Sequence, residues 1–392
     1  MIKKIVLTFP LIFGLLLYSC SDDPSSVGLN LLDQDIPKFD TINSIDGSFT
    51  QTSSYFKKVV PLGASPRLLV GKSSEFTAHT LLLQGFLLPD SIKNGFKEDS
   101  LTIDKAYIEL FPNYFYPGSD SLAQFDFTVQ KILSSWSSST FTADSFSVLQ
   151  FDAADLSSNK EFGDSIYSFD IPLDFAREII NFAMNPDSVP YYGVLISPTA
   201  SSQKIVGFNG FTPFQELDSR LKIIVSKAGE YTDTLNAFTA SDVSVVIGEI
   251  PQPDPGYILL QSSLIINSRL YFDLSAIPEN VAINRAALTL YSDSTKNVFG
   301  SQYDDAVIAY TVVNSETDSV STSLFARLEG SESKYSGNIT AILKYWLLEN
   351  KNYGLILRPE TEQNGLELFY LHGSEAADIS KRPYLEIIYS YN

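Results

Sequence analysis

The sequence repeats itself, and this repetition limits the possible folds more than any other feature. Five blocks of the first half recur in the same order in the second half. The paired blocks are 40–43 with 233–236, 81–89 with 270–278, 101–111 with 281–291, 192–198 with 353–359, and 221–226 with 385–390. Chance similarity would not keep this order, so we infer an internal duplication. We expect two modules, module one at 40–227 and module two at 228–392.

Each module is predicted to consist mostly of strands. Residues 106–111 and 125–132 alternate between apolar and polar side chains, which is typical of half-buried strands. Each copy also contains one amphipathic helical pattern, at 174–184 and at 339–349, and Trp346 lies on the apolar stripe of the second. We predict an all-β protein of two tandem jelly-roll-type β-sandwich modules, each with one short helix.

The N-terminus has the features of a signal peptide. Lys3 and Lys4 precede an apolar run over 5–17. This run is too short to span a bilayer comfortably, since a spanning helix takes about 20 residues. No later segment has a comparable apolar length. We therefore predict a signal peptide at 1–19 and no spanning helix in the mature protein.

A single cysteine follows the apolar run directly. The residues Leu17-Tyr18-Ser19-Cys20 resemble a bacterial lipobox, in which the cysteine is lipidated and becomes the first residue of the mature chain. We predict lipidation of Cys20, with the lipid chains anchoring the protein to a membrane. The alternative is that Cys20 is an ordinary free thiol near a standard cleavage site.

Residues 20–39 are predicted to form a lipidated tether. Asp22 and Asp23 lie close behind the cysteine and resemble the short export signal of Bacteroidetes surface lipoproteins. This resemblance implies a bacterial outer-membrane protein exposed on the cell surface. The alternative is a plain flexible tether without an address.

Four stretches of module two carry a family resemblance. They are 268–278, 283–291, 352–357 and 382–389. Together they resemble the DNRLRE-type domain, a secreted β-sandwich of bacterial surface proteins related to carbohydrate-binding modules. The match covers module two nearly end to end, and module one resembles the family only through module two. The resemblance implies a non-catalytic accessory or adhesion role outside the cell, and it identifies no ligand-binding residues.

Composition excludes several functions. The 46 acidic and 27 basic residues give a net charge of −19, which argues against binding nucleic acid. Catalysis by a serine–histidine pair would need one of the two histidines. His79 is placed at the solvated edge of a strand, and His372 lies in a turn two residues before Ser374. We read that closeness as a feature of the turn, so the protein is not expected to be an enzyme.

No cofactor is expected, although the fold class allows a structural calcium ion. The candidate oxygen ligands are Asp120, the pair Asp304-Asp305, and Asp152 with Asp155. None of them has the regular spacing of an EF-hand loop. The alternative is that they are solvated turn residues.

Exposed aromatic side chains are the candidate ligand contacts. Tyr114, Phe115 and Tyr116 lie between two prolines, and Trp136 precedes a run of Ser and Thr. Such rings could stack on sugars, while nearby amides and carboxylates bind the hydroxyl groups. The alternative is that these rings cover the end of the sandwich or fold back onto the core.

Two functions remain open. The first is a surface lipoprotein that binds glycans, with Tyr114, Tyr116 or Trp136 exposed in a shallow groove. The second is a structural or adhesive surface lipoprotein that docks a protein partner, with buried aromatic residues and a flat, acidic exterior.

Overall fold

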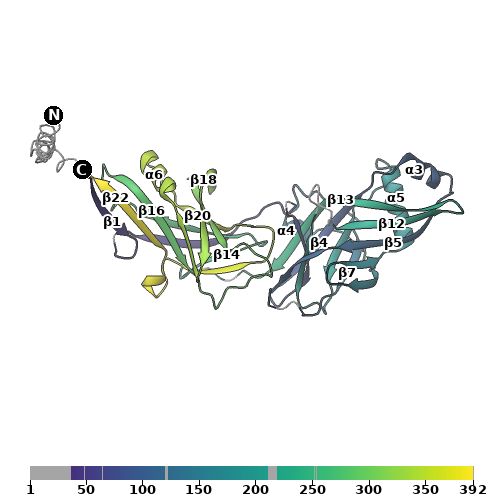
Figure 1. Ribbon diagram of the computed structural model, residues 1–392, viewed down its shortest axis with the longest axis horizontal. Coiled ribbons are helices and arrows are strands. Elements are labelled where there is room, and N and C mark those ends of the chain that lie inside the picture. The colour runs from purple at the N-terminus through teal and green to yellow at the C-terminus, as the bar shows by residue number, and fades with distance from the viewer. Residues whose placement is uncertain are drawn as a thin grey trace, which may run out of the picture.

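Two antiparallel β-sandwiches lie end to end in the structure, a computed structural model (Figure 1). It describes residues 37–391 except 48, 64, 120, 121, 211–218, 251 and 253. The signal peptide, Cys20 and most of the tether therefore lie outside the described residues. The expected all-β sandwich fold is confirmed. Within the described ranges, no helix is both long and apolar enough to cross a membrane.

The first sandwich combines two sheets that share one long strand, β13. Its strands are β3 (Arg67–Lys72), β4 (Phe76–Gly85), β5 (Thr102–Leu110), β6 (Pro112–Tyr116), β7 (Phe127–Lys131), β8 (Ser158–Phe162), β9 (Tyr167–Asp170), β10 (Val194–Pro198), β11 (Ile205–Asn209), β12 (Arg220–Lys227) and β13 (Tyr231–Gly248). Its helices are α3 (Asp90–Lys97), α4 (Ala143–Phe146) and α5 (Leu173–Met184). The predicted helix is α5, and the two shorter helices were not expected.

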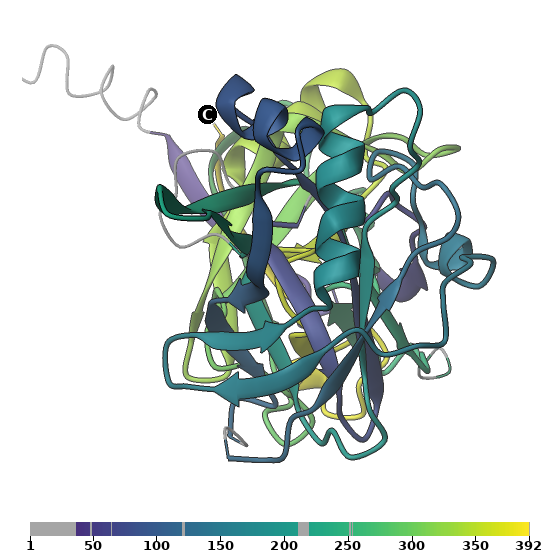
Figure 2. The same ribbon diagram turned by 90° about the vertical axis from the view of Figure 1, so that its right-hand side faces the viewer.

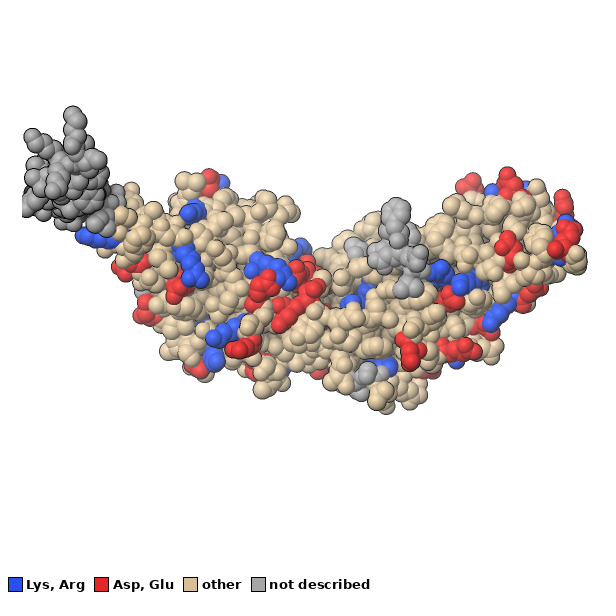
Figure 3. All heavy atoms as spheres, in the orientation of Figure 1, with Lys and Arg blue, Asp and Glu red and all other residues tan. Residues whose placement is uncertain are grey.

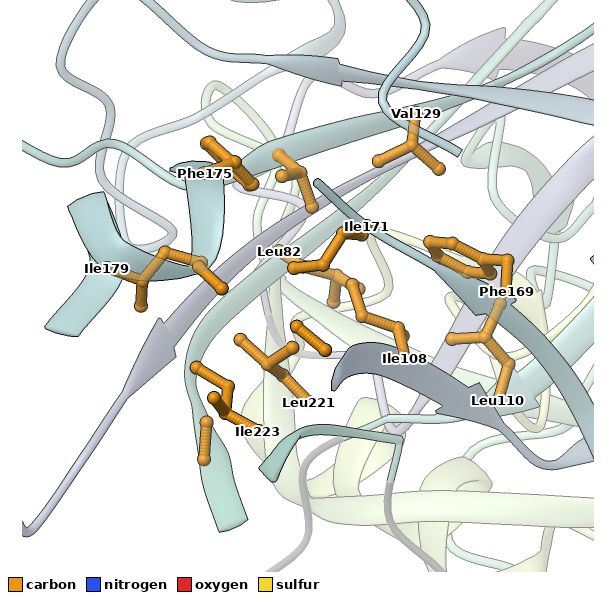
Figure 4. Close-up of a cluster of buried hydrophobic side chains, with 14 of the residues drawn as sticks. Leu82, Ile108, Leu110, Val129, Phe169, Ile171, Phe175, Ile179, Leu221 and Ile223 are labelled. Atoms are coloured by element: carbon orange, nitrogen blue, oxygen red, sulfur yellow. The ribbon is translucent and has the colours of Figure 1, made fainter. Parts of the chain in front are cut away.

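The core of the first sandwich lies between its two sheets. Alternate residues of β5 and β12, such as Ile108 and Ile223, point inward and meet Leu82 and Val129 of the opposite sheet (Figure 4). Helix α5 places Phe175 and its apolar neighbours on the same cluster. Viewed end-on, the teal helix α5 stands upright near the centre, in front of the strands (Figure 2). The period-2 and period-3.6 patterns read from the sequence therefore bury their apolar faces in one core.

The second sandwich repeats this arrangement. Its strands are β1 (Lys38–Asn43), β2 (Gln51–Lys57), β14 (Tyr257–Gln261), β15 (Ile266–Phe272), β16 (Ala282–Tyr291), β17 (Ala306–Asn314), β18 (Ser319–Ser331), β19 (Lys334–Asn338), β20 (Leu355–Pro359), β21 (Leu368–His372) and β22 (Tyr384–Tyr391). It also contains α6 (Thr340–Glu349) and a 3₁₀ turn at Ile379–Lys381. Trp346 of α6 is 1% exposed, so its predicted place in the core is confirmed.

The strand pairings divide the chain differently from the boundary expected between 227 and 228. Strands β1 and β2 open module one, yet they pair with β22 and β15 of the second sandwich. Strand β13 opens module two, yet it pairs with β12 and β4 of the first. Each repeat thus gives its opening strands to the other copy. The cause is the tight turn between β12 and β13, because it folds β13 back onto β12 as a hairpin. Since β13 is then used in the first sandwich, the edge of β22 in the second sandwich is free to pair with β1.

The two copies keep equivalent registers in spite of this exchange. Thr41 faces Ile388, and its repeat counterpart Thr234 faces Ile224. Strands β5 and β16 each have a register shift, at Asp104 in β5 and at Asn284 in β16. The duplication aligns these two residues with each other. The duplication read from the sequence is therefore also visible in the pairing of the strands.

A third apolar cluster joins the two sandwiches. It contains Leu69 and Ile205 of the first sandwich, and Leu259 and Leu368 of the second, all nearly inaccessible to solvent. Leu69 and Leu259 occupy the same position in equivalent strands β3 and β14, and Ile205 and Leu368 do so in β11 and β21. The sandwiches therefore meet through the same face of the duplicated sheet. We call this contact the junction.

Candidate functional site

Two of the aromatic residues predicted to contact a ligand are buried in the junction. Tyr114 and Tyr116 are 0% and 1% exposed. Strand β6 is the edge strand of its sheet and pairs with β11, and its alternate side chains Tyr114 and Tyr116 face the second sandwich. The expectation that these rings are exposed is wrong. Phe115, between them, is partly buried, and the ammonium group of Lys204 lies 5.0 Å from its ring centre.

Tyr114 is also the centre of a polar network across the junction. Its hydroxyl donates to Oε1 of Glu367 at 2.9 Å and accepts from the backbone N–H of Leu366 at 2.9 Å. The guanidinium group of Arg67 lies 4.4 Å from the centre of the Tyr114 ring. Burial raises the pKa of Glu367, while the Tyr114 hydroxyl and Arg67 oppose this rise. These contacts hold two sandwiches together and leave no room for a ligand on Tyr114.

Trp136 is half-buried and serves as part of a lid. Its Nε1 donates to the carbonyl of Tyr192 at 2.8 Å, and its ring packs edge-on against Phe141. Residues 132–151, which we call the lid, cover the outer face of β4, β10 and β13 with an apolar layer. Trp136 therefore folds back onto the first sandwich, as in the alternative left open above, and its ring stays half-buried. Contact of Trp136 with a ligand stays a prediction.

The histidines take part in packing. His372 stacks on Tyr257, whereas the Ser374 hydroxyl is bonded to Ser53, so these contacts do not form a serine–histidine pair. His79 is not solvated as expected. Its ring lies 4.7 Å from that of Phe146 under the lid, and burial lowers its pKa to about 4.

The calcium candidates are used in turns, where the structure describes them. Asp152 and Asp155 accept backbone N–H groups two residues ahead, and Asp305 accepts the Tyr335 hydroxyl. Asp120 lies outside the described residues. Among the residues that are described, no group of three or more His, Cys, Asp or Glu side chains could hold a metal ion. Calcium binding stays a prediction.

One face of the second sandwich carries polar and aromatic groups in an ordered row. The outer sides of β2, β15, β20, β17 and β18 form this surface, which we call the open face. Ser54, Arg269, Ile356, Tyr310 and Phe325 lie in register across the five strands. Phe325 is 49% exposed, and its ring centre lies 5.5 Å from that of Tyr310. The row thus begins with the polar side chains of Ser54 and Arg269, passes over Ile356, which is 1% exposed, and ends in the partly buried Tyr310 and the exposed Phe325.

Charged side chains surround these rings. The guanidinium group of Arg358 lies 4.9 Å from the centre of the Tyr310 ring and 3.4 Å from a carboxylate oxygen of Glu362. Arg327, next to Phe325 along β18, binds both carboxylate oxygens of Glu360 at 2.7–3.0 Å. At the other end of the row, Arg269 forms an ion pair with Asp318. Paired arginines of this kind are held in fixed orientations and keep further N–H groups for a ligand.

Two buried polar atoms on this face have no hydrogen-bond partner within the described part of the chain. Asn267 is fully buried, and its Nδ2 donates to Oε1 of Glu362 at 2.9 Å, yet its Oδ1 is unpartnered. The Nε of Arg358 is also unpartnered. An unpaired buried polar group in a native protein costs roughly 1–3 kcal/mol. Such groups therefore indicate a place where a ligand or ordered water completes the bonding.

The same face of the first sandwich is closed by the lid. By strand register, its positions equivalent to Ser54, Arg269 and Ile356 are Val243, Leu81 and Leu195, all apolar and fully buried. The structure thus aligns Leu81 with Arg269, one residue away from the sequence pairing of 81 with 270. They pack against the lid in a single apolar cluster. The two copies have therefore diverged at one face, which is covered in the first sandwich and open in the second.

The open face was missed in the sequence because its residues look like ordinary outward-facing strand positions. The available signal was the repeat itself, because the blocks 192–198 and 353–359 align the uncharged Ser197 with the charged Arg358. Comparisons with family models, with curated proteins and with solved structures found no match for this chain.

Proposed function

We propose that this protein is a non-catalytic, lipid-anchored surface lipoprotein of a bacterial outer membrane that binds glycans through the open face. The observation that carries the proposal is the meeting of an exposed ring, Phe325, and its partly buried neighbour Tyr310 with the unpartnered polar atoms of Asn267 and Arg358. Flat rings pack against the apolar faces of sugars, and guanidinium, amide and carboxylate groups bind sugar hydroxyls. The resemblance of module two to the DNRLRE-type domain agrees with this role.

The predicted anchor suits the arrangement of the described chain. Strand β1 begins at the end of the second sandwich farthest from the first (Figure 1). Cys20 precedes Lys38 by 18 residues, which span at most about 60 Å when extended. A lipid at Cys20 would hold the second sandwich near the membrane and present the first farther out. Basic and acidic groups are interspersed on the face seen in Figure 3, in keeping with a solvated exterior and without a basic stripe for nucleic acid.

A glycan array tests the binding role. The soluble chain from Ser21 onward is compared with a Tyr310→Ala, Phe325→Ala variant, and Phe151→Ala serves as the matched control because Phe151 is 40% exposed on the first sandwich. We expect the double variant to lose binding by about tenfold or more, because two rings no longer bury apolar surface against the sugar and a loss of about 1.4 kcal/mol is already tenfold. Binding that survives in the double variant, or no binding by the parent chain, would overturn the glycan role.

The anchor is tested separately. A Cys20→Ala protein should leave the membrane fraction of cells and lose incorporation of labelled lipid. Membrane partition that persists in this variant would contradict the predicted lipidation.

The second candidate function is a structural or adhesive surface lipoprotein that docks a protein partner. The junction favours it, because the buried Tyr114, Tyr116 and their apolar neighbours turn two sandwiches into one extended body. If the array retains no glycan, crosslinking on intact cells decides this alternative. A partner chain crosslinked to the open face or to the first sandwich is the result it predicts.

A further inference from the structure

The end of the second sandwich where the described chain begins has an unusual apolar surface. The turn at 277–283 separates two adjoining grooves. One, of about 770 Å³, lies between this turn and Leu347 and Leu348 of α6. The other, of about 700 Å³, lies between the turn and the ends of β1 and β22, including Tyr391. Because both grooves are lined by Pro278 to Val281, they form one continuous surface, which we call the anchor end.

Large apolar side chains at the anchor end are exposed. Leu348 is 85% exposed, and Leu347 and Tyr391 are 40% exposed each. Phe39 is 65% exposed, but it points to the other face of β1 from Asp40 and lines neither groove. A helix in a water-soluble sandwich normally turns its leucines inward, as α6 does with Ile342, Leu343 and Trp346. Contiguous exposed apolar groups of this kind mark a surface that contacts another apolar phase.

The position of the chain start identifies that phase. Tyr391, at the end of β22, pairs with Lys38, at the start of β1, so both limits of the described residues 37–391 lie at this end. The predicted lipid at Cys20 is 18 residues upstream of Lys38, so the anchor end is the part of the described protein held nearest the bilayer. Lys38 lies on the same end and Lys344 lines the groove, and long cationic side chains of this kind reach lipid headgroups.

We propose that the anchor end is a lipid-binding surface that inserts Leu347 and Leu348 into the headgroup region of the membrane. This inference rests on the predicted lipid anchor in the proposed function, and it is independent of glycan binding. Tyrosines are favoured at such an interface because their rings are apolar and their hydroxyls remain wet, which suits Tyr391. A lipid anchor supplies attachment, and the inserted side chains would fix the orientation, with the first sandwich pointing outward.

The test uses the chain from Ser21 onward, which lacks any cysteine, with a hexahistidine tag at its N-terminus. The tag binds vesicles of phosphatidylcholine containing a nickel-chelating lipid, so the assay does not depend on lipidation. An environment-sensitive nitrobenzoxadiazole label is placed at Leu348→Cys, with Leu133→Cys on the first sandwich as the control, since Leu133 is 49% exposed.

We expect the label at 348 to shift to shorter wavelength on attachment to vesicles and to be quenched by lipids with a spin label near the headgroup, whereas the label at 133 stays unchanged. A label at 348 that stays in a water-like environment on the vesicle would overturn the proposal. A label that is already shielded without vesicles would also overturn it. Shielding that does not depend on protein concentration would show that the chain itself covers position 348, and shielding at high concentration only would show that a second copy covers it. Failure of Cys20 lipidation would appear in the fractionation assay and leave this result unaffected.

A second variant checks the energetic contribution. Without the tag, Leu347→Ser, Leu348→Ser should weaken partition onto the same vesicles by about tenfold or more, because two leucines no longer leave water on binding. Urea unfolding of this variant, expected to match the parent, separates a binding defect from a folding defect. Unchanged partition would contradict the proposal.

Discussion

Removing one hydroxyl group from the junction should destabilise the whole chain. The Tyr114→Phe substitution keeps the buried ring and deletes only the group that donates to Glu367 and accepts from the backbone of Leu366. A hydrogen bond to a charged group is worth roughly 1.5–3 kcal/mol, and the orphaned buried amide adds to the loss. We therefore expect the free energy of unfolding to fall by about 3 kcal/mol.

The cost should depend on pH. Burial raises the pKa of Glu367, so the folded state holds its proton at a higher pH than the unfolded state does. The protonated Glu367 carboxyl therefore contributes its full stabilisation at a pH below its pKa in the unfolded chain. This contribution is lost as the pH rises through its higher pKa in the folded protein. The Tyr114 hydroxyl favours the ionised carboxylate and limits this loss. Tyr114→Phe should consequently cost more at pH 7 than at pH 4.

Urea unfolding followed by circular dichroism measures both effects on the chain from Ser21 onward. Tyr231→Phe is the matched control, because Tyr231 is 40% exposed and should change stability by less than about 0.5 kcal/mol. Glu367→Gln combined with Tyr114→Phe should recover part of the loss, since no charge is then left buried. A loss below about 0.5 kcal/mol for Tyr114→Phe, or a loss of glycan binding with unchanged stability, would refute the role assigned to Tyr114.

Three further predictions concern single features of the fold. Gly193→Ala and Gly354→Ala should each lower the free energy of unfolding in urea by at least about 2 kcal/mol, since both glycines have positive φ and face a backbone carbonyl. The loss should be larger at Gly193, where an added Cβ would lie 2.0 Å from the carbonyl oxygen, than at Gly354, where this distance is 2.7 Å. Wild-type stability of either variant would contradict this. Because burial lowers the pKa of His79 to about 4, folded stability should fall as pH drops from about 6.5 to about 4, and His79→Gln should flatten this fall; parallel curves would count against it. Deleting residues 1–44 removes β1, so hydrogen exchange should accelerate in β22 and remain slow in β12, and the reverse result would exclude the strand exchange.

The sequence predicted the repeated elements because their patterns are local. Alternation in β5 and β16, the apolar stripes of α5 and α6, and the order of the blocks all follow from nearby residues. It could not predict which copy each opening strand completes. The block at 40–43 fits the edge of β12 as well as that of β22, and only the hairpin between β12 and β13 decides between them.

The misplaced ligand site has a similar cause. A run such as 112–116 shows that alternate side chains share a face, and it does not show whether another domain covers that face. Tyr114 and Tyr116 therefore looked available for a ligand, and the junction covers both. Conversely, no sequence pattern singled out Arg269 or Tyr310 as ligand contacts. Their significance appears only beside the first sandwich, where the same face is apolar and covered by the lid.

The most direct test of this account compares the two copies at one equivalent position. Leu81→Cys and Arg269→Cys are introduced separately into the chain from Ser21 onward, which contains no other cysteine. Leu81 is fully buried under the lid, whereas the side chain of Arg269 is 40% exposed. In the folded protein we expect a maleimide to modify Cys at position 269 rapidly and to leave position 81 unmodified until the chain unfolds. Equal rates at the two positions, or protection of position 269, would contradict the claim that one face of the duplicated sandwich is closed in the first copy and open in the second.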